Sequence, residues 1–260
     1  MRVNRPNLLS WYNTAPDTTS LPTFRSDCRK AALITYIGEV TQFYMNLKTP
    51  GPVVADDPTV TLVEYRTGGV ATEVSADLGF DQIELGVSNP FGSMLCPDVV
   101  PGLYYWKIEW GSRTWTSAPI EVIEQQEAKQ VSIRAELHHR KAVHGVRYPW
   151  LDSDYMCRFR FRAIRVGAPQ YPVETSSYRE VSTGIVRNYN IAADKLVKFQ
   201  TTPADPDLLE GIQWMLLHDT ILLNGISYTT REFLTSQAKN SNLENGTFAL
   251  IDNSYATSLY

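Results

Sequence analysis

The chain has 260 residues, of which 43% are hydrophobic, and a formal net charge of −4. This mild acidic balance argues against a dedicated nucleic-acid binder, which concentrates positive charge. The three cysteines lie far apart and form no CxxC pair, so we expect no disulfide framework and synthesis in a reducing compartment. No apolar run is long enough to cross a membrane, and the first residues lack a signal-peptide core, so we expect no membrane insertion.

Aromatic residues and turn formers dominate the composition. The chain contains 14 Tyr, 9 Phe and 6 Trp, which favour strands, and 15 Gly and 15 Pro, which supply turns. We therefore predict a mainly β protein with two β-sandwich (Ig-like) domains. The second domain is expected to carry one inserted helix, and an extended N-terminal arm precedes the first.

Residues 1–22 are predicted to form this arm, because three prolines and a polar run oppose regular structure. The arm is nevertheless too apolar for a solvated tail. Its large apolar residues are Leu8, Leu9, Trp11 and Tyr12. They either pack on their own domain or dock onto a neighbouring subunit, and the sequence favours neither reading.

Residues 23–125 are predicted to form a small Ig-like β-sandwich, since about seven short strands alternate with turn signals. Gly68-Gly69 and Gly111-Ser112 mark two tight turns. The Cys–Trp–Cys core of antibody domains is absent, so only the architecture is inferred. The predicted strands are 31–37, 41–47, 59–66, 70–74, 83–87, 103–110, 114–115 and 120–123.

Residues 126–147 are polar with short apolar breaks, and we interpret them as a linker or exposed loop between the domains. A strand over 130–137 followed by a loop is the alternative. Residues 148–260 are predicted to form the second sandwich, with strands over 156–166, 178–181, 185–191, 196–201, 220–223, 226–229, 230–238 and 248–251.

One helix is predicted at about 205–218 in the second domain. Asp205 offers an N-cap and Pro206 fits the first helical position, where no N–H is needed. Asp207 adds negative charge at the positive end of the helix dipole. Four residues form one apolar stripe, namely Leu208, Ile212, Met215 and Leu216. Asn224-Gly225 predicts a tight hairpin turn after the following strand.

The strand 156–166 reads MCRFRFRAIRV. Its period of two places the arginines on one face and the aromatic residues on the other. The arginines are Arg158, Arg160 and Arg162. They form either a solvated sheet face or a contact surface for an acidic neighbour or for passing DNA, since guanidinium groups pair with carboxylates and phosphates. The acidic helix start, Asp205 and Asp207, is a candidate partner on another copy.

The sequence contains no recognisable catalytic motif such as a P-loop, a dinucleotide fingerprint, HExxH or GxSxG. A zinc site from His138, His144 and Cys157 would lack a firm fourth ligand. Close carboxylate pairs are better explained by turns and helix capping. These pairs are Asp56 with Asp57, Asp152 with Asp154, and Asp205 with Asp207. We therefore expect no enzyme, no cofactor and no metal.

Two stretches resemble virion proteins of tailed phages that infect Bacteroidota. Residues 101–122, PGLYYWKIEWGSRTWTSAPIEV, resemble the last strands of their Ig-like domains. Residues 171–178, 198–202 and 222–228 are similar to the C-terminal part of the same proteins, with crAss-like phages as the first comparison. Together the two matches touch about half of the chain, and each motif alone could arise in any β-sandwich.

The resemblance implies a structural protein of the tail or connector (neck), made in the host cytoplasm and located in the virion. Its partners would be further copies in a homo-oligomeric ring and other tail or portal proteins, with passive DNA contact if a face lines a channel. It implies no catalytic residues.

Two alternatives stay open. One is a carbohydrate- or receptor-binding β-sandwich that uses Trp106, Trp110 and Trp115, although core and rim packing is the more common role of such residues. The other is a hydrolase with a dispersed site.

Overall fold

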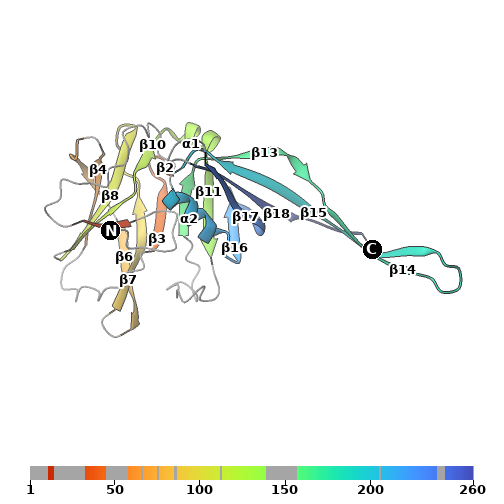
Figure 1. Ribbon diagram of the computed structural model, residues 1–260. Coiled ribbons are helices and arrows are strands. Elements are labelled where there is room, and N and C mark those ends of the chain that lie inside the picture. Colours follow the sequence, from red (N-terminus) through yellow and green to blue (C-terminus); the bar gives the residue numbers. More distant parts are fainter. Residues whose placement is uncertain are drawn as a thin grey trace.

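The computed structural model describes residues 11–14, 33–44, 58–65, 67–74, 76–84, 87–111, 113–138, 157–204, 206–238 and 244–259. Within these ranges the protein is mainly β, with 18 strands and 2 helices, which confirms the predicted β-rich class (Figure 1).

The strands of the first half form two connected groups. In one group, β5 pairs with β4, β4 with β8, and β8 with β9 and β10; β10 also pairs with β2 in parallel. In the other group, β3 pairs with β7 and β7 with β6. The elements are β1 Trp11–Thr14, β2 Leu33–Thr35, β3 Val40–Tyr44, β4 Thr59–Glu64, β5 Val70–Glu73, β6 Ala76–Glu84, β7 Val87–Leu95, β8 Gly102–Trp110, β9 Arg113–Ser117 and β10 Ile120–Val122.

β9 and β10 follow one another along the same edge of β8, because the opposite edge of β8 carries β4. Ala118 and Pro119 interrupt the ladder between them. The Trp106 N–H donates to the Ser117 hydroxyl oxygen at 2.9 Å, which satisfies a buried backbone donor at the break.

The second half continues the same hydrogen-bonded network. From β12 the order runs through β11, β16, β17 and β18 to β15, and β13 and β14 both pair with β15. The elements are α1 Gln125–Val131, β11 Ile133–His138, β12 Cys157–Phe161, β13 Ala163–Gln170, β14 Val173–Arg179, β15 Val186–Thr201, α2 Pro206–Met215, β16 Thr220–Leu223, β17 Ile226–Ala238 and β18 Glu244–Leu259.

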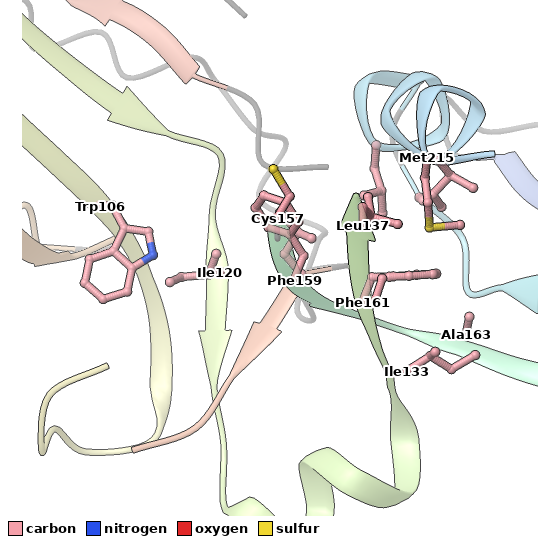
Figure 2. Packing of buried hydrophobic residues seen from close by; sticks show 14 of the residues in the cluster. Trp106, Ile120, Ile133, Leu137, Cys157, Phe159, Phe161, Ala163 and Met215 are labelled. Carbon is pink, nitrogen blue, oxygen red and sulfur yellow. The ribbon is translucent and has the colours of Figure 1, made fainter. Parts of the chain in front are cut away.

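β12 joins the two halves. Arg160 lies opposite Ile34 of β2, and Arg158 lies opposite Gln42 of β3. Apolar side chains from both halves meet in one core, in which Trp106 and Ile120 lie on one side of Phe159, and Leu137, Phe161 and Met215 lie on the other (Figure 2).

The predicted linker over 126–147 is wrong where the structure describes it. α1 and β11 occupy 125–138, apart from Ser132 between them, and Ala128 and Ala135 are fully buried. The alternative of a strand over 130–137 is confirmed from Ile133 onward, where β11 begins and alternate residues such as Ile133 and Leu137 face the core, whereas residues 130 and 131 end α1. Residues 139–147 lie outside the described ranges.

The predicted helix is confirmed as α2, and all four residues of its apolar stripe are buried. Asn224 and Gly225 have φ values of 51° and 81°, as the predicted hairpin turn requires. Gly111 likewise turns β8 into β9 with a φ of 56°.

Several predicted strands have other boundaries, and the segments 185–191 and 196–201, for example, belong, apart from Ile185, to the single strand β15. The strand over 83–87 is wrong, because Glu84 ends β6 and lies opposite Val87, the start of β7. The strand over 156–166 divides at Arg162 into β12 and β13, and the two segments 226–229 and 230–238 form the single strand β17.

Candidate functional site

The predicted arginine face lies inside the protein. Arg160 donates from Nε to Glu39 Oε1 at 2.9 Å, and the side chains of the two residues are 5% and 7% exposed. The Arg160 guanidinium also lies 5.4 Å from the centre of the Tyr36 ring and donates to Ser132 Oγ at 3.4 Å. Arg160 therefore ties β12 to the turn before β3 and to the end of α1.

The neighbouring arginines of β12 are paired as well. Arg162 Nη2 lies 2.7 Å from Glu121 Oε2 on β10 and is buried. Arg158 Nε lies 3.1 Å from Glu136 Oε2 on β11 and is about one-third exposed. A contact surface for a neighbour or for DNA is therefore wrong for Arg160 and Arg162, and it stays a prediction for Arg158.

Alternation along β12 is correct, but both faces of the strand are covered. Phe159 and Phe161 enter the main core, and the arginine face lies against a smaller apolar cluster. That cluster consists of Ile34, Ile123 and Ala128 with Tyr36 and Val131. Two-sided burial depends on elements far away in the chain, so the alternation alone could not reveal it.

Burial raises the pKa of Glu39, and the nearby Arg160 offsets this effect only in part. A buried carboxylate loses hydration, and its close partner compensates incompletely. The pair therefore fixes how β12 sits against the turn before β3, and its net contribution to the free energy of unfolding is small.

The structure describes only residues 11–14 of the predicted N-terminal arm. Trp11–Thr14 form β1, which pairs with the free edge of β9, and the Trp11 side chain is 0% exposed. Trp11 thus packs on its own chain, which was one of the two readings of the arm. Leu8, Leu9 and the side chain of Tyr12 lie outside the described residues, as do Asp205 and the side chain of Asp207, so their subunit contacts stay predictions.

The three tryptophans proposed for carbohydrate binding lie in the core. Trp106, Trp110 and Trp115 are 0%, 5% and 2% exposed. A sugar-stacking platform built from them is therefore wrong, and the core-packing alternative is confirmed.

Among the described side chains we looked for groups that could bind a metal or act as a nucleophile. No group of three or more His, Cys, Asp or Glu suitable for a metal occurs among them. Burial raises the pKa of the Cys96 thiol to about 12 and that of Cys157 further, so both thiols are protonated at neutral pH. His218 lies at the end of α2 with Nδ1 3.0 Å from the Trp214 carbonyl.

The most exposed apolar surface lies on a projection that the sequence did not reveal. We call this projection the arm ribbon: it comprises the outer parts of β13 and β15, the strand β14, the turns that join these strands, and the part of β18 that runs with them. It extends away from the rest of the molecule, with the β14 hairpin at its far end and the C-terminus along its side (Figure 1). Among the residues whose side chains the structure describes, fourteen large apolar ones are exposed, and eight of these lie on the arm ribbon, namely Ile164, Val166, Tyr171, Val173, Tyr178, Val181, Ile185 and Val186.

Both faces of the arm ribbon are exposed to solvent along residues 164–168 and 181–187. Successive residues of a strand point to opposite faces, so a run of exposed residues means that neither face is covered. All five residues from Ile164 to Ala168 are exposed, and so are all seven from Val181 to Arg187. An uncovered ribbon of two or three strands has little stability of its own in water.

The outermost turn of the arm ribbon is nevertheless well ordered by hydrogen bonds. The Ile185 carbonyl accepts from the Glu180 N–H at 2.9 Å, and the Glu180 carbonyl accepts from the Gly184 N–H at 2.8 Å. The Thr183 hydroxyl donates to the Glu180 carboxylate at 2.6 Å. This turn displays Val181 in full contact with solvent.

The inner part of the arm ribbon is anchored by an ion pair. Lys195 Nζ on β15 lies 2.8 Å from Asp252 Oδ2 on β18, and the Asp252 side chain is 4% exposed. Burial opposes ionisation of Asp252, but the hydrogen bonds from Lys195 and Ser254 outweigh it and lower the pKa of this carboxyl.

Sequence reasoning missed the arm ribbon for a physical reason. A half-buried strand shows apolar alternation, and this ribbon has no buried face to impose it. The signal that was available is a cluster of large apolar residues over 164–186 without a consistent period of two.

Comparisons with known proteins found no matching family model and no matching curated protein. Neither helix in the described ranges is long and apolar enough to span a membrane.

Proposed function

We propose that the protein is a structural component of a tailed-phage virion, where copies of it form a multimeric ring in the tail or connector. The observation that carries the assembly part of this proposal is the arm ribbon, whose eight large apolar side chains are exposed to solvent. Exposed apolar clusters of this kind mark interaction sites. Covering each half-exposed side chain would contribute on the order of 1 kcal/mol.

The reach of the arm ribbon fits a contact between subunits. Ten residues separate Ala193, opposite Val173 at the base of β14, from Thr183 in the end turn. A strand rises about 3.3 Å per residue, so this hairpin extends roughly 33 Å, about the diameter of a small domain.

Strand pairing in the first half supports an Ig-like sandwich within this proposal. β4, β8 and β9 with β10 take the places of strands C, F and G, and β3, β7 and β6 take those of B, E and D. The assignment to a phage virion depends on the sequence resemblance of residues 101–122 and of the second half. Other tail or portal proteins would be the further partners.

The ion pairs of the β12 arginines limit which residues could line a DNA channel in such a ring. Because Arg160 and Arg162 are buried against carboxylates, they do not support a basic lining of a channel. The buried tryptophans likewise remove the main support for a carbohydrate-binding module.

The test is the solution mass of two proteins measured by light scattering over a range of concentrations. In the variant, residues 174–192 are replaced by Asn-Gly, which joins Val173 directly to its partner Ala193. We expect the full chain to form multimers, seen as rings by electron microscopy, and the shortened chain to be a monomer. An equal mass for both proteins would contradict the role of the arm ribbon.

Val70→Asp is a matched control, because it places a charge on an exposed apolar site of the edge strand β5 in the first half. It should leave the multimer unchanged. The near-UV circular dichroism of the shortened chain should match that of the full chain, since the core residues are all retained.

A further inference from the structure

The first half carries its own small apolar patch, formed by Ile37, Val40 and Leu95. Val40 and Leu95 lie directly opposite each other in the β3–β7 ladder, so their side chains share one face. Glu39 and Met94, which precede them in the chain, are buried, so this shared face points outward. Ile37 lies in the adjoining turn, and the three side chains are 43%, 37% and 44% exposed.

Backbone hydrogen bonds and an ion pair fix the backbone under the patch. The Gly38 N–H donates to the Cys96 carbonyl, and the Cys96 N–H donates to the Glu39 carbonyl, both at 2.9 Å. The Glu39 carboxylate is fixed by Arg160. A rigid apolar surface loses little conformational entropy when a partner covers it.

The end of the arm ribbon has complementary properties. Its hydrogen-bonded turn presents Val181 and Ile185, and Arg179 and Arg187 flank the turn with one carboxylate, Glu180, between them. This end is therefore apolar with a positive balance. Asp98, which is exposed three residues after Leu95, would offer such an end a carboxylate near the patch.

One chain cannot bring these two surfaces together. Figure 1 shows β3 and β7 in the main body, while the β14 hairpin points away from it. We infer that the end of the arm ribbon docks on the Ile37–Val40–Leu95 patch of a second copy. The inference rests on the proposed self-assembly and names its contact. Because the two surfaces differ, the contact is head-to-tail, which closes into a ring when the rotation between copies permits.

The test is cross-linking between two different variants, each of which carries one introduced cysteine at an exposed site. Cys28 is replaced by Ser in both, and the buried Cys96 and Cys157 are kept. One protein carries Val181→Cys and the other Leu95→Cys, and a short bis-maleimide is added to their mixture. We expect a cross-linked dimer that contains one copy of each, identified by mass spectrometry.

Control variants distinguish docking on the patch from contact between two arm ribbons and from non-specific cross-linking. Ile226→Cys replaces Leu95→Cys as an exposed apolar site elsewhere and should give no product with Val181→Cys. If multimers form but Val181→Cys cross-links only to another Val181→Cys, the arm ribbons contact each other. That result would overturn the inferred contact but not the proposed function. A full chain that stays monomeric at every concentration would overturn both.

A charge exchange gives a second, independent measurement. Arg179→Glu alone and Asp98→Arg alone should each weaken assembly about two- to fivefold, as expected for an exposed ion pair. The double variant should restore the affinity of the original chain. Additive weakening in the double variant would overturn the pairing of these two surfaces.

Val181→Asp tests the apolar part of the contact, with Ser182→Asp as the matched control for charge alone. Val181→Asp should weaken assembly about tenfold or more, because a carboxylate would be buried without a partner. Ser182→Asp should have a clearly smaller effect. Equal effects would show that charge, and not burial of Val181, governs the contact, and would overturn the inference.

Discussion

The β12 junction and the arm ribbon distribute polar and apolar groups in opposite ways. At the junction, Arg160 and Glu39 are buried together, although charged groups normally face water. On the arm ribbon, Val181 and Ile185 face water, although apolar groups normally face a core. The charges at the junction are paired within one chain, whereas the apolar side chains of the arm ribbon are proposed to be covered by a partner. Substitutions at the first should therefore change stability, and substitutions at the second should change assembly.

The largest effect is expected at the buried ion pair. Arg160→Ala leaves the Glu39 carboxylate buried without its partner, which should lower the free energy of unfolding by about 3–5 kcal/mol. Arg158→Ala on the same strand removes a more exposed pair and should cost no more than about 1 kcal/mol. Urea unfolding of both variants measures the difference. Similar losses in the two variants would contradict the distinction between the two pairs.

Trp11 provides the next test, because β1 belongs to the main body although it lies in the predicted N-terminal arm. Trp11→Ala empties a fully buried site and should cost about 3 kcal/mol of stability. Thermal unfolding monitors the loss. If Trp11→Ala instead leaves stability unchanged and abolishes multimers, Trp11 serves a neighbouring subunit.

Two glycines allow the same substitution to be made in the arm ribbon and in the main body. Gly184 in the end turn of the arm ribbon and Gly225 in the β16–β17 turn have φ values of 70° and 81°, with nothing within 4 Å of an added Cβ. Alanine at either position should cost about 1 kcal/mol through backbone strain alone. Gly225→Ala should lower the unfolding free energy, and Gly184→Ala should mainly weaken assembly. Unfolding and light scattering on both variants test this separation.

The smallest effect is the pH dependence from Glu39. Because burial raises its pKa above the ordinary 4.5, the folded protein binds this proton more tightly than the unfolded chain does. The free energy of unfolding should therefore fall as the pH rises from 4.5 through the raised value, and the contribution should be constant above it. Glu39→Gln should lack this slope in unfolding measured from about pH 4 to about pH 8. An opposite slope would mean that Arg160 outweighs burial.

Local features were predictable from the sequence because they depend on neighbouring residues. The apolar stripe of α2, the Asn224-Gly225 turn and the alternation along β12 each follow from a period or a turn preference within a few residues. The partner of Arg160 did not follow, because Glu39 lies 121 residues away. Whether a strand face meets solvent or another layer is decided by such distant contacts.

The candidate site was less predictable than the fold. Two of the three arginines chosen as contacts are buried, and Trp11 packs on its own chain. The arm ribbon was read as ordinary strands of a sandwich, since strand propensity is the same whether or not a second layer follows. Exposure of both faces becomes visible only in three dimensions.

The position of β12 in the chain has a consequence for the order of events during synthesis. β2 and β3 emerge from the ribosome early, but their partner strand β12 begins only at Cys157. The turn that presents Ile37 therefore lacks Arg160 until more than half of the polypeptide has been made. Until then the patch around Ile37 is unfinished, and the β14 hairpin that is proposed to bind it is translated after β12. If copies associate as proposed, their contact would form only after β12 has completed the acceptor surface.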